Sequence, residues 1–212
     1  MRTKILISAT LLMMAFSVGL FVAIGDRTAT RYPDISGLLW PEPPVIESFR
    51  LIDDAGNAFT ERNLRDRWTF VFFGFTNCPD ICPTTLNTLN QVYEQLRDYE
   101  TLFEKFQVLF VSVDPDRDKR EMLGTYVDYF NKAFVGATAD DEQLSQFARQ
   151  FGVLYLKVDT PDGAGYTMDH SASVLLVDPE LRFIGIFSQP HSAGDITDRL
   201  TRMVSFVEGT KQ

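Results

Sequence analysis

A very apolar run from Trp68 to Phe75 is the feature that most constrains the fold of this chain. A continuous run of this kind is typical of a central strand that is covered on both faces. A second run, Gln107 to Val113, has the same character, and between the two runs apolar residues recur at helical spacing from about Pro83 to Phe106. A strand, a helix and a second buried strand in this order predict an α/β layer fold.

The rest of the chain continues this alternation of elements. We predict helices over 118–129, 140–151 and 195–207, and strands over 49–53, 58–60, 153–158, 172–177 and 183–187. Strands joined through a helix pair in parallel, whereas strands joined by a short turn pair antiparallel. The sheet is therefore expected to be mixed, with helices packed against it.

The first 25 residues differ from the rest of the chain. Arg2 and Lys4 precede the uncharged stretch Ile5–Gly25, which would span about 32 Å as a helix. This length matches the hydrocarbon core of a bilayer and exceeds the usual core of a cleaved signal peptide. We therefore predict one N-terminal transmembrane helix in residues 1–25, with a cleaved signal as the alternative. The leading positive charges place the N-terminus in the cytoplasm and the remaining chain outside it.

A proline-rich segment follows the predicted anchor. Residues 26–46 contain four prolines, and such a segment stays extended and acts as a spacer. The folded domain is then expected over residues 47–212. The net charge of −9 and the lack of a basic cluster argue against a nucleic-acid partner.

The only two cysteines of the chain lie where the first buried strand gives way to the helical pattern. Cys78 and Cys82 are four positions apart, so on one helical turn their Cβ atoms would lie roughly 5–6 Å apart. Two thiolates at that spacing can share one metal ion or close into a disulfide. A disulfide here would close a loop of only a few residues and add little stability, so we assign both cysteines a functional role. The positive end of the helix would favour their thiolate forms.

Two cysteines alone make a poor metal site, and the chain has only two histidines. His170 comes just before an apolar strand, where it could face the cysteines across the end of the sheet. His191 lies in a loop without buried flanks, so the residues favour His170 but leave His191 as an alternative. A set of two cysteines and one histidine suits Cu(I), and its imidazole also tolerates Cu(II). Three ligands leave one coordination position open, whereas a closed structural zinc site would want four.

An acidic cluster follows the second buried strand. Asp114, Asp116 and Asp118 lie there together with Arg117. Three carboxylates could form a site for a hard metal ion. Turn formation and helix capping explain the same residues, and we predict that Asp118 caps the helix that follows.

Three separate motifs of the chain resemble the Sco/SenC family. They are Phe73–Leu86 around the two cysteines, Val111–Asp118, and Asp169–Ala172 around the first histidine. They occur in the family's order and spacing, and the resemblance extends from about Pro41 to Val207. Members of this family are membrane-anchored, thioredoxin-like copper proteins that assist the assembly of cytochrome c oxidase.

The resemblance implies a set of site residues and a role. The copper ligands fall on Cys78, Cys82 and His170, which decides between the two histidines. Independently of the resemblance, Asp169 directly precedes the ligand histidine, where it could steady the imidazole or balance its charge, or could be an ordinary polar residue of a surface turn. The implied role is delivery of copper to the dinuclear centre of cytochrome c oxidase subunit II. Other periplasmic copper carriers or thiol reductases would be further partners. The chain would then be a single-pass protein of the bacterial inner membrane, with its thioredoxin-like domain facing the periplasm.

A second class of function uses the same cysteines. In a thiol-disulfide oxidoreductase or a peroxidase-like enzyme, Cys78 and Cys82 would cycle between thiol and disulfide, and His170 would only tune the thiolate. Such an enzyme would act on the cysteines of oxidase subunit II or in redox defence. A copper chaperone needs the third ligand and the enzyme does not. The two roles can coexist, because copper loading requires both thiols to be reduced.

Overall fold

The computed structural model describes residues 35–39, 41–160, 163 and 165–209. In chain order its elements are β1 (Arg50–Asp53), β2 (Ala58–Thr60), α2 (Glu61–Leu64), β3 (Trp68–Gly74), α3 (Ile81–Gln95), a 3-10 helix (Leu96–Asp98), α4 (Glu100–Glu104), β4 (Phe106–Ser112), α5 (Arg120–Phe130), β5 (Val135–Thr138), α6 (Asp141–Gln150), β6 (Tyr155–Asp159), β7 (Tyr166–His170), β8 (Val174–Val177), β9 (Phe183–Phe187) and α7 (Ala193–Gly209).

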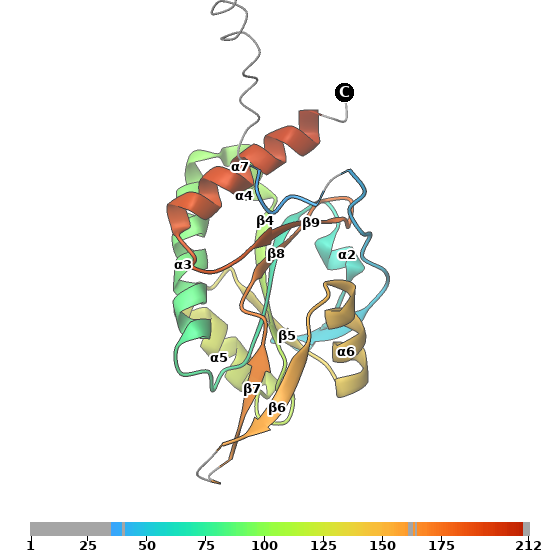
Figure 1. The fold of residues 1–212 in the computed structure, drawn as a ribbon, viewed down its shortest axis with the longest axis vertical. Coiled ribbons are helices and arrows are strands. Elements are labelled where there is room, and N and C mark those ends of the chain that lie inside the picture. The colour runs from blue at the N-terminus through green and yellow to red at the C-terminus, as the bar shows by residue number, and fades with distance from the viewer. Residues whose placement is uncertain (1–34, 40, 161–162, 164, 210–212) are drawn as a thin grey trace, which may run out of the picture. The chain divides into compact units, whose positions relative to one another are not determined.

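A seven-stranded mixed sheet runs through the centre of the domain (Figure 1). Its strand order is β2-β1-β5-β4-β3-β8-β9. β4 pairs in parallel with both β3 and β5, while the other neighbours pair antiparallel. The parallel strands are joined through helices and the outer antiparallel pairs by short turns. The mixed α/β architecture predicted from the sequence is therefore confirmed.

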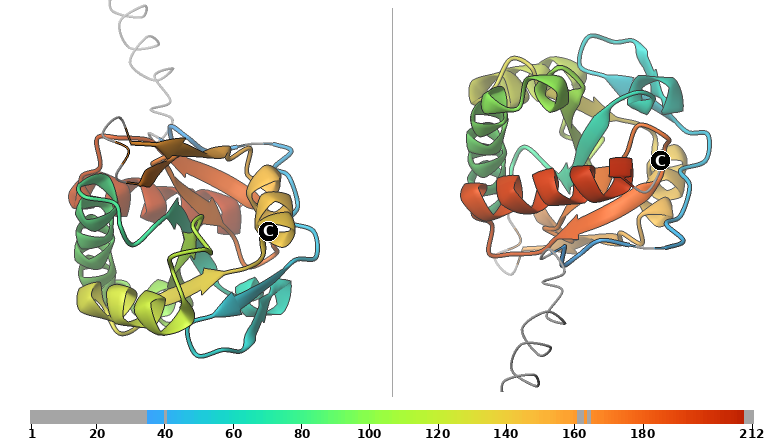
Figure 2. Two further views of the ribbon diagram at one scale, coloured as in Figure 1. Left: turned by 90° about the horizontal axis from the view of Figure 1, so that it is seen from below. Right: turned by 90° about the horizontal axis from the view of Figure 1, so that it is seen from above.

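Helices cover both faces of this sheet (Figure 2). β3 is buried along its whole length, and its side chains alternate between the two layers. Phe70 and Phe72 pack in a cluster with residues of α3, α5 and α7, whereas Val71 and Phe73 pack in a cluster with residues of α6. The one polar side chain of β3, Thr69, is fully buried and accepts a hydrogen bond from Gln107 Nε2 at 2.8 Å. A polar side chain without such a partner would lie unpaired in a core, which is why the rest of the run is apolar.

The long helix predicted from about Pro83 to Phe106 is divided in the structure. α3 ends at Gln95, a 3-10 turn follows, and α4 begins at Glu100. Tyr99, between the last two, has φ −117° and ψ 67°, outside the helical region. Leu96 and Leu102 are both buried. The apolar spacing thus continues across an interruption of the helix, so the spacing alone does not reveal where α3 ends.

A two-stranded antiparallel ribbon of β6 and β7 lies outside the main sheet. Figure 1 shows this ribbon extending beyond the body of the fold. The sequence patterns do not predict β7, because Tyr166–His170 contains three polar residues in five and no apolar run. The last residue of β7 is the candidate ligand His170, so the ribbon carries part of the site.

The predicted linker, residues 26–46, is folded onto the domain in its described part. The Leu39 N–H donates to a β9 carbonyl at 2.7 Å, and the Ile186 N–H donates to the Gly37 carbonyl at 2.8 Å. Gly37 has φ +84°, and a Cβ there would lie 2.1 Å from the Ile186 carbonyl oxygen, so this approach requires glycine. From Ile35 onward the chain therefore belongs to the folded domain and does not act as a spacer.

None of the helices in the described part of the chain combines the length and apolarity that a membrane span requires. The transmembrane helix predicted in residues 1–25 lies outside the described residues, as does the first part of the predicted linker, residues 26–34. Both remain predictions.

Candidate metal centre

The two cysteines lie at the connection between β3 and α3. Cys78 is in the loop, and Cys82 is the second residue of α3. The Cys82 N–H donates to Cys78 Sγ at 3.4 Å, so this sulfur satisfies one of the free amides at the start of the helix. Both residues are free thiols. The expectation that the pair shares one helical turn is corrected here, because Cys78 precedes the helix and its side chain reaches the helix start from the loop.

His170 completes a group of three potential ligand atoms. Its Nε2 lies 3.6 Å from Cys82 Sγ. The ligand atoms of Cys78, Cys82 and His170 all lie within 4.8 Å of one another. Nδ1 of the imidazole lies 2.9 Å from the Ser171 carbonyl oxygen. A carbonyl only accepts hydrogen bonds, so we assign the proton to Nδ1, which leaves the lone pair of Nε2 directed at the sulfur.

Burial sets the protonation of this group. Cys82 is fully buried, whereas Cys78 and His170 are half-buried. Burial raises the pKa of the Cys82 thiol and lowers the pKa of His170. The imidazole is thus held neutral for ligation, and Cys82 has to release a proton when it binds a metal. The expectation that the helix end favours thiolate is wrong for Cys82, because burial of the sulfur raises the pKa of this thiol.

Aromatic rings and one glycine shape the inner wall of the site. The ring centroids of Phe72 and Phe75 lie 6.4 Å and 5.7 Å from that of His170, both edge-on. A Cβ on Gly74 would lie 2.9 Å from Cys82 Sγ and 2.6 Å from an edge atom of Phe110. Glycine at the end of β3 therefore allows the Cys82 sulfur to lie directly against the sheet.

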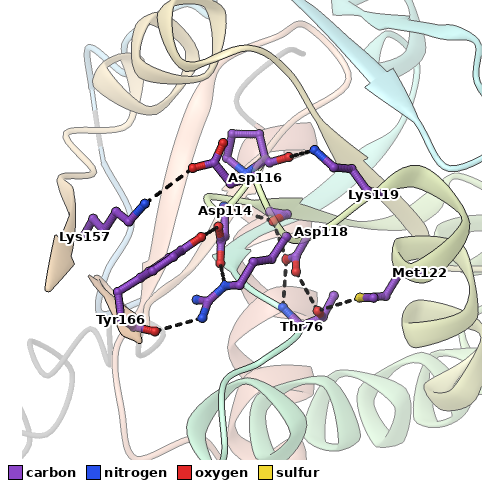
Figure 3. Close-up of polar contacts among 11 residues, drawn as sticks. Thr76, Asp114, Asp116, Asp118, Lys119, Met122, Lys157 and Tyr166 are labelled. Atoms are coloured by element: carbon purple, nitrogen blue, oxygen red, sulfur yellow. Dashed lines mark hydrogen bonds and ion pairs between the residues drawn. The ribbon is translucent and has the colours of Figure 1, made fainter. Parts of the chain in front are cut away.

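Asp118 ties the loop before Cys78 to the end of β4 (Figure 3). Its carboxylate is fully buried and accepts hydrogen bonds from the Thr76 N–H at 2.8 Å, the Thr76 hydroxyl at 2.6 Å and the Ser112 hydroxyl at 2.5 Å. The predicted helix cap at this residue is wrong, because Lys119 occupies the N-cap position of α5. A buried carboxylate is costly unless it is fully paired, so these bonds hold Thr76, two residues before the first cysteine.

A second group of contacts fastens the β6–β7 ribbon (Figure 3). The Tyr166 hydroxyl donates to Asp114 at 2.8 Å, and Arg117 donates through Nη1 to the Tyr166 carbonyl at 2.8 Å. Arg117 also pairs with Asp114. The Arg117 guanidinium carbon and the Lys157 Nζ each lie 3.8 Å from the centroid of the Tyr166 ring. Asp118 of the acidic cluster therefore holds the loop before Cys78, and Asp114 with Arg117 holds the ribbon that carries His170. The cluster does not form a hard-metal site.

Asp169 acts on His170 only through its charge, and His191 is not one of the grouped ligands. Asp169 is exposed on the face of β7 opposite His170, because successive strand residues point to opposite faces. Its charge raises the pKa of His170, against the larger effect of burial, while Ser171 supplies the hydrogen bond that orients the ring. His191 is half-buried rather than solvated, and its Nε2 lies 2.9 Å from the Ala172 carbonyl oxygen.

Sequence reasoning missed Thr76, Ser112 and Phe72 as parts of the site. Threonine and serine are common everywhere, and the partner of Thr76 lies 42 residues further along the chain. The one usable signal was the acidic cluster directly after a buried strand, the end of an α/β sheet at which sites gather.

Comparison with known proteins identifies the family of this chain. The SCO1/SenC family model matches residues 41–205. The chain belongs to this family. It is 34% identical over 156 residues to the mitochondrial SCO1 homolog 1 of Arabidopsis thaliana and 36% identical over 154 residues to the mitochondrial SCO2 homolog of Bos taurus. These matches cover 74% and 73% of this chain, but only 46% and 58% of the two relatives, so the chain spans about half of their length.

Solved structures of the family share the fold. The crystal structure of Arabidopsis thaliana ScoI with copper bound has a TM-score of 0.70 to this chain at 33% identity. The match covers 76% of this chain and 98% of that one. The mixed sheet with helices on both faces is thus the thioredoxin-like architecture of Sco proteins.

The donor set itself fits a soft metal ion. Two thiolates and a neutral imidazole match Cu(I), and the imidazole also suits Cu(II). In the part of the chain that the structure describes, the group of Cys78, Cys82 and His170 is the only cluster of three or more potential metal ligands. It offers three ligands where a closed tetrahedral site has four, so a bound ion would keep one position open.

Proposed function

We propose that this protein is a membrane-anchored copper chaperone. It would bind one copper ion through Cys78, Cys82 and His170 and pass it to the dinuclear copper centre of cytochrome c oxidase, with subunit II as the partner. The convergence of these three ligand atoms within 4.8 Å carries the proposal. Membership of the SCO1/SenC family and the copper-bound structure of a relative support it.

The open coordination position explains how copper would leave. A ligand of the acceptor enters the vacant position first, and the chaperone's own ligands then leave one at a time. Cys78 is the more accessible of the two sulfurs, because Cys82 is buried against Gly74. Exchange would therefore begin on the side of Cys78, where the acceptor can reach the ion.

The location of the protein is part of the proposal. The uncharged stretch in residues 1–25 would hold the chain in the bacterial inner membrane, and the domain would face the periplasm. Membrane fractionation with protease protection of spheroplasts tests this placement. A soluble protein that starts near Asp26 would contradict the anchor and identify the segment as a cleaved signal.

Anaerobic titration of the reduced chain with Cu(I) against a competing chelator tests the ligand set. The wild-type chain should bind one copper, and Cys78→Ser, Cys82→Ser and His170→Ala should each lose tight binding. His191→Gln is the matched control, because glutamine can still donate to the Ala172 carbonyl. Loss of binding in this control, equal to that in His170→Ala, would contradict the assignment.

A second candidate function is thiol-disulfide exchange. The half-buried Cys78 next to the buried Cys82 is the arrangement of an attacking and a resolving thiol, and it favours this candidate. The raised pKa of Cys82 disfavours its thiolate form, so Cys82 would not be the attacking thiol in such an exchange. His170→Ala separates the two functions, because it should remove copper binding and leave disulfide exchange with a model dithiol intact. A deletion strain that keeps full oxidase activity under copper limitation but becomes sensitive to oxidants would favour exchange.

A further inference from the structure

The outer face of the β6–β7 ribbon carries an exposed apolar stripe. Leu154, Leu156 and Val158 are 78%, 66% and 44% exposed. Alternate residues of a strand share a face, so Leu156 and Val158 of β6 lie on one face, and Leu154 directly precedes the strand. They are three of the eight large apolar side chains that are exposed in the described part of the chain; of the other five, Met122 and Tyr129 lie on α5, and the remaining three lie on separate segments. Single exposed apolar residues are ordinary, but a group of them marks an interaction surface.

The inner face of the same ribbon is already occupied. Tyr166 is held by Asp114 and Arg117, and Met168 packs against both hydrophobic clusters of the domain. These contacts fix the ribbon, so the stripe on its outer face cannot turn inward. The exposure of Leu154 and Leu156 is therefore a feature of the folded domain.

The stripe begins beside the metal centre. In the register of the ribbon, Tyr155 lies opposite His170 and Leu156 lies opposite Asp169. Leu154 and Leu156 thus flank the residue paired with the candidate ligand, while Leu156 and Val158 point to the face of the ribbon opposite His170. Figure 1 shows the ribbon projecting from the body of the fold, where another protein can approach it. A protein seated on the stripe would lie on the outer face of the ribbon, whose inner face carries His170, and would reach the open copper position around the edge of the two-stranded ribbon.

Charge identifies the kind of partner. Asp169 and Asp159 are exposed on the ribbon, and Asp116 beside it is 76% exposed, at 3.5 Å from the ribbon's lysine, Lys157. The whole chain has a net charge of −9. An anionic membrane surface would be repelled here, whereas a protein face with an apolar centre and lysine or arginine around it would be complementary.

We propose that the stripe Leu154, Leu156 and Val158 is the docking surface for the protein that receives copper, and that the receiving face is apolar with a basic rim. This inference rests on the proposed function, since it names how the same site meets its partner. Docking through exposed side chains separates recognition from ligation. The stripe can therefore be altered without touching Cys78 or His170.

The test uses full-length protein in detergent, loaded with Cu(I), and the soluble domain of oxidase subunit II as the acceptor. In the double variant Leu154→Thr/Leu156→Thr, threonine keeps the strand propensity and removes the apolar surface. We expect normal copper stoichiometry and affinity, with a transfer rate at least about tenfold below wild type. Val45→Thr, a change at an exposed apolar residue outside the ribbon, is the matched control and should transfer at the wild-type rate. Added salt should slow wild-type transfer.

Three results would overturn the inference. Equal transfer rates in the double variant and the wild type would show that the stripe is not used. If size-exclusion chromatography finds a dimer for the wild type and a monomer for the double variant, the stripe would be assigned to contact with a second copy of this chain. A wild-type chain that binds copper normally but transfers none to subunit II would contradict the proposed function itself, and the docking surface with it.

Discussion

Replacing Asp118 should both destabilise the domain and loosen the cysteine loop. The buried carboxylate accepts three hydrogen bonds, two from Thr76 and one from Ser112. Bonds to a charged acceptor contribute about 1.5–3 kcal/mol each, and the cost of burying the charge offsets several kcal/mol of their sum. Asp118→Ala leaves all three donors unpaired, so we expect a loss of about 3–5 kcal/mol.

Asp118→Asn provides a graded comparison. The amide oxygen can accept from the Thr76 N–H and the Ser112 hydroxyl, and the amide nitrogen can donate to the Thr76 hydroxyl oxygen. Only the charge is lost, so the expected destabilisation is about 1–2 kcal/mol. Asp116→Ala is the control in the same loop, because this carboxylate is exposed, and it should change stability by less than about 0.5 kcal/mol.

Urea unfolding followed by circular dichroism measures these differences. With a urea m-value of about 2 kcal/mol/M, Asp118→Ala should lower the unfolding midpoint by roughly 2 M. Copper affinity should fall in the same order, from wild type through Asp118→Asn to Asp118→Ala, because Thr76 lies two residues before Cys78. An Asp118→Ala chain as stable as the Asp116→Ala chain would refute the role of Asp118 in holding the loop before Cys78. Normal stability combined with lost copper binding would instead give Asp118 a direct role at the metal.

Three further outcomes are expected. Gly74→Ala should cost about 1–3 kcal/mol in thermal unfolding and weaken copper binding, because the new Cβ would meet Phe110 and the Cys82 sulfur; an unchanged melting temperature would contradict the close packing. Because burial lowers the pKa of His170, the unfolded chain takes up this proton first as the pH falls through about 6.5. The metal-free chain should therefore lose stability below that pH, and His170→Gln should lose less; equal slopes for both proteins in pH-dependent urea unfolding would contradict this. Mild oxidation should join Cys78 to Cys82 and abolish copper binding, and thiol counting by mass spectrometry that still finds two free thiols in the oxidised monomer would refute the pairing.

Much of the site was visible in the sequence, because chemistry and periodicity are local properties. The run Trp68–Phe75 had to be a strand buried on both faces, since no other element accommodates such a sequence at that length. The two cysteines directly after it could only lie at the end of that strand. The residue types alone favoured a soft metal ion, and the motif around His170 indicated the third ligand through its resemblance to the family.

The tertiary structure decided what depends on residues distant in the chain. It placed His170 at the end of a ribbon, 88 residues after Cys82, and turned Asp169 away from the site. It made Asp118 a buried hydrogen-bond acceptor and not the expected helix cap, because Thr76 and Ser112 offer stronger partners than a helix end in solvent. It also raised the pKa of Cys82, since burial depends on the packing around a residue and not on its neighbours in sequence.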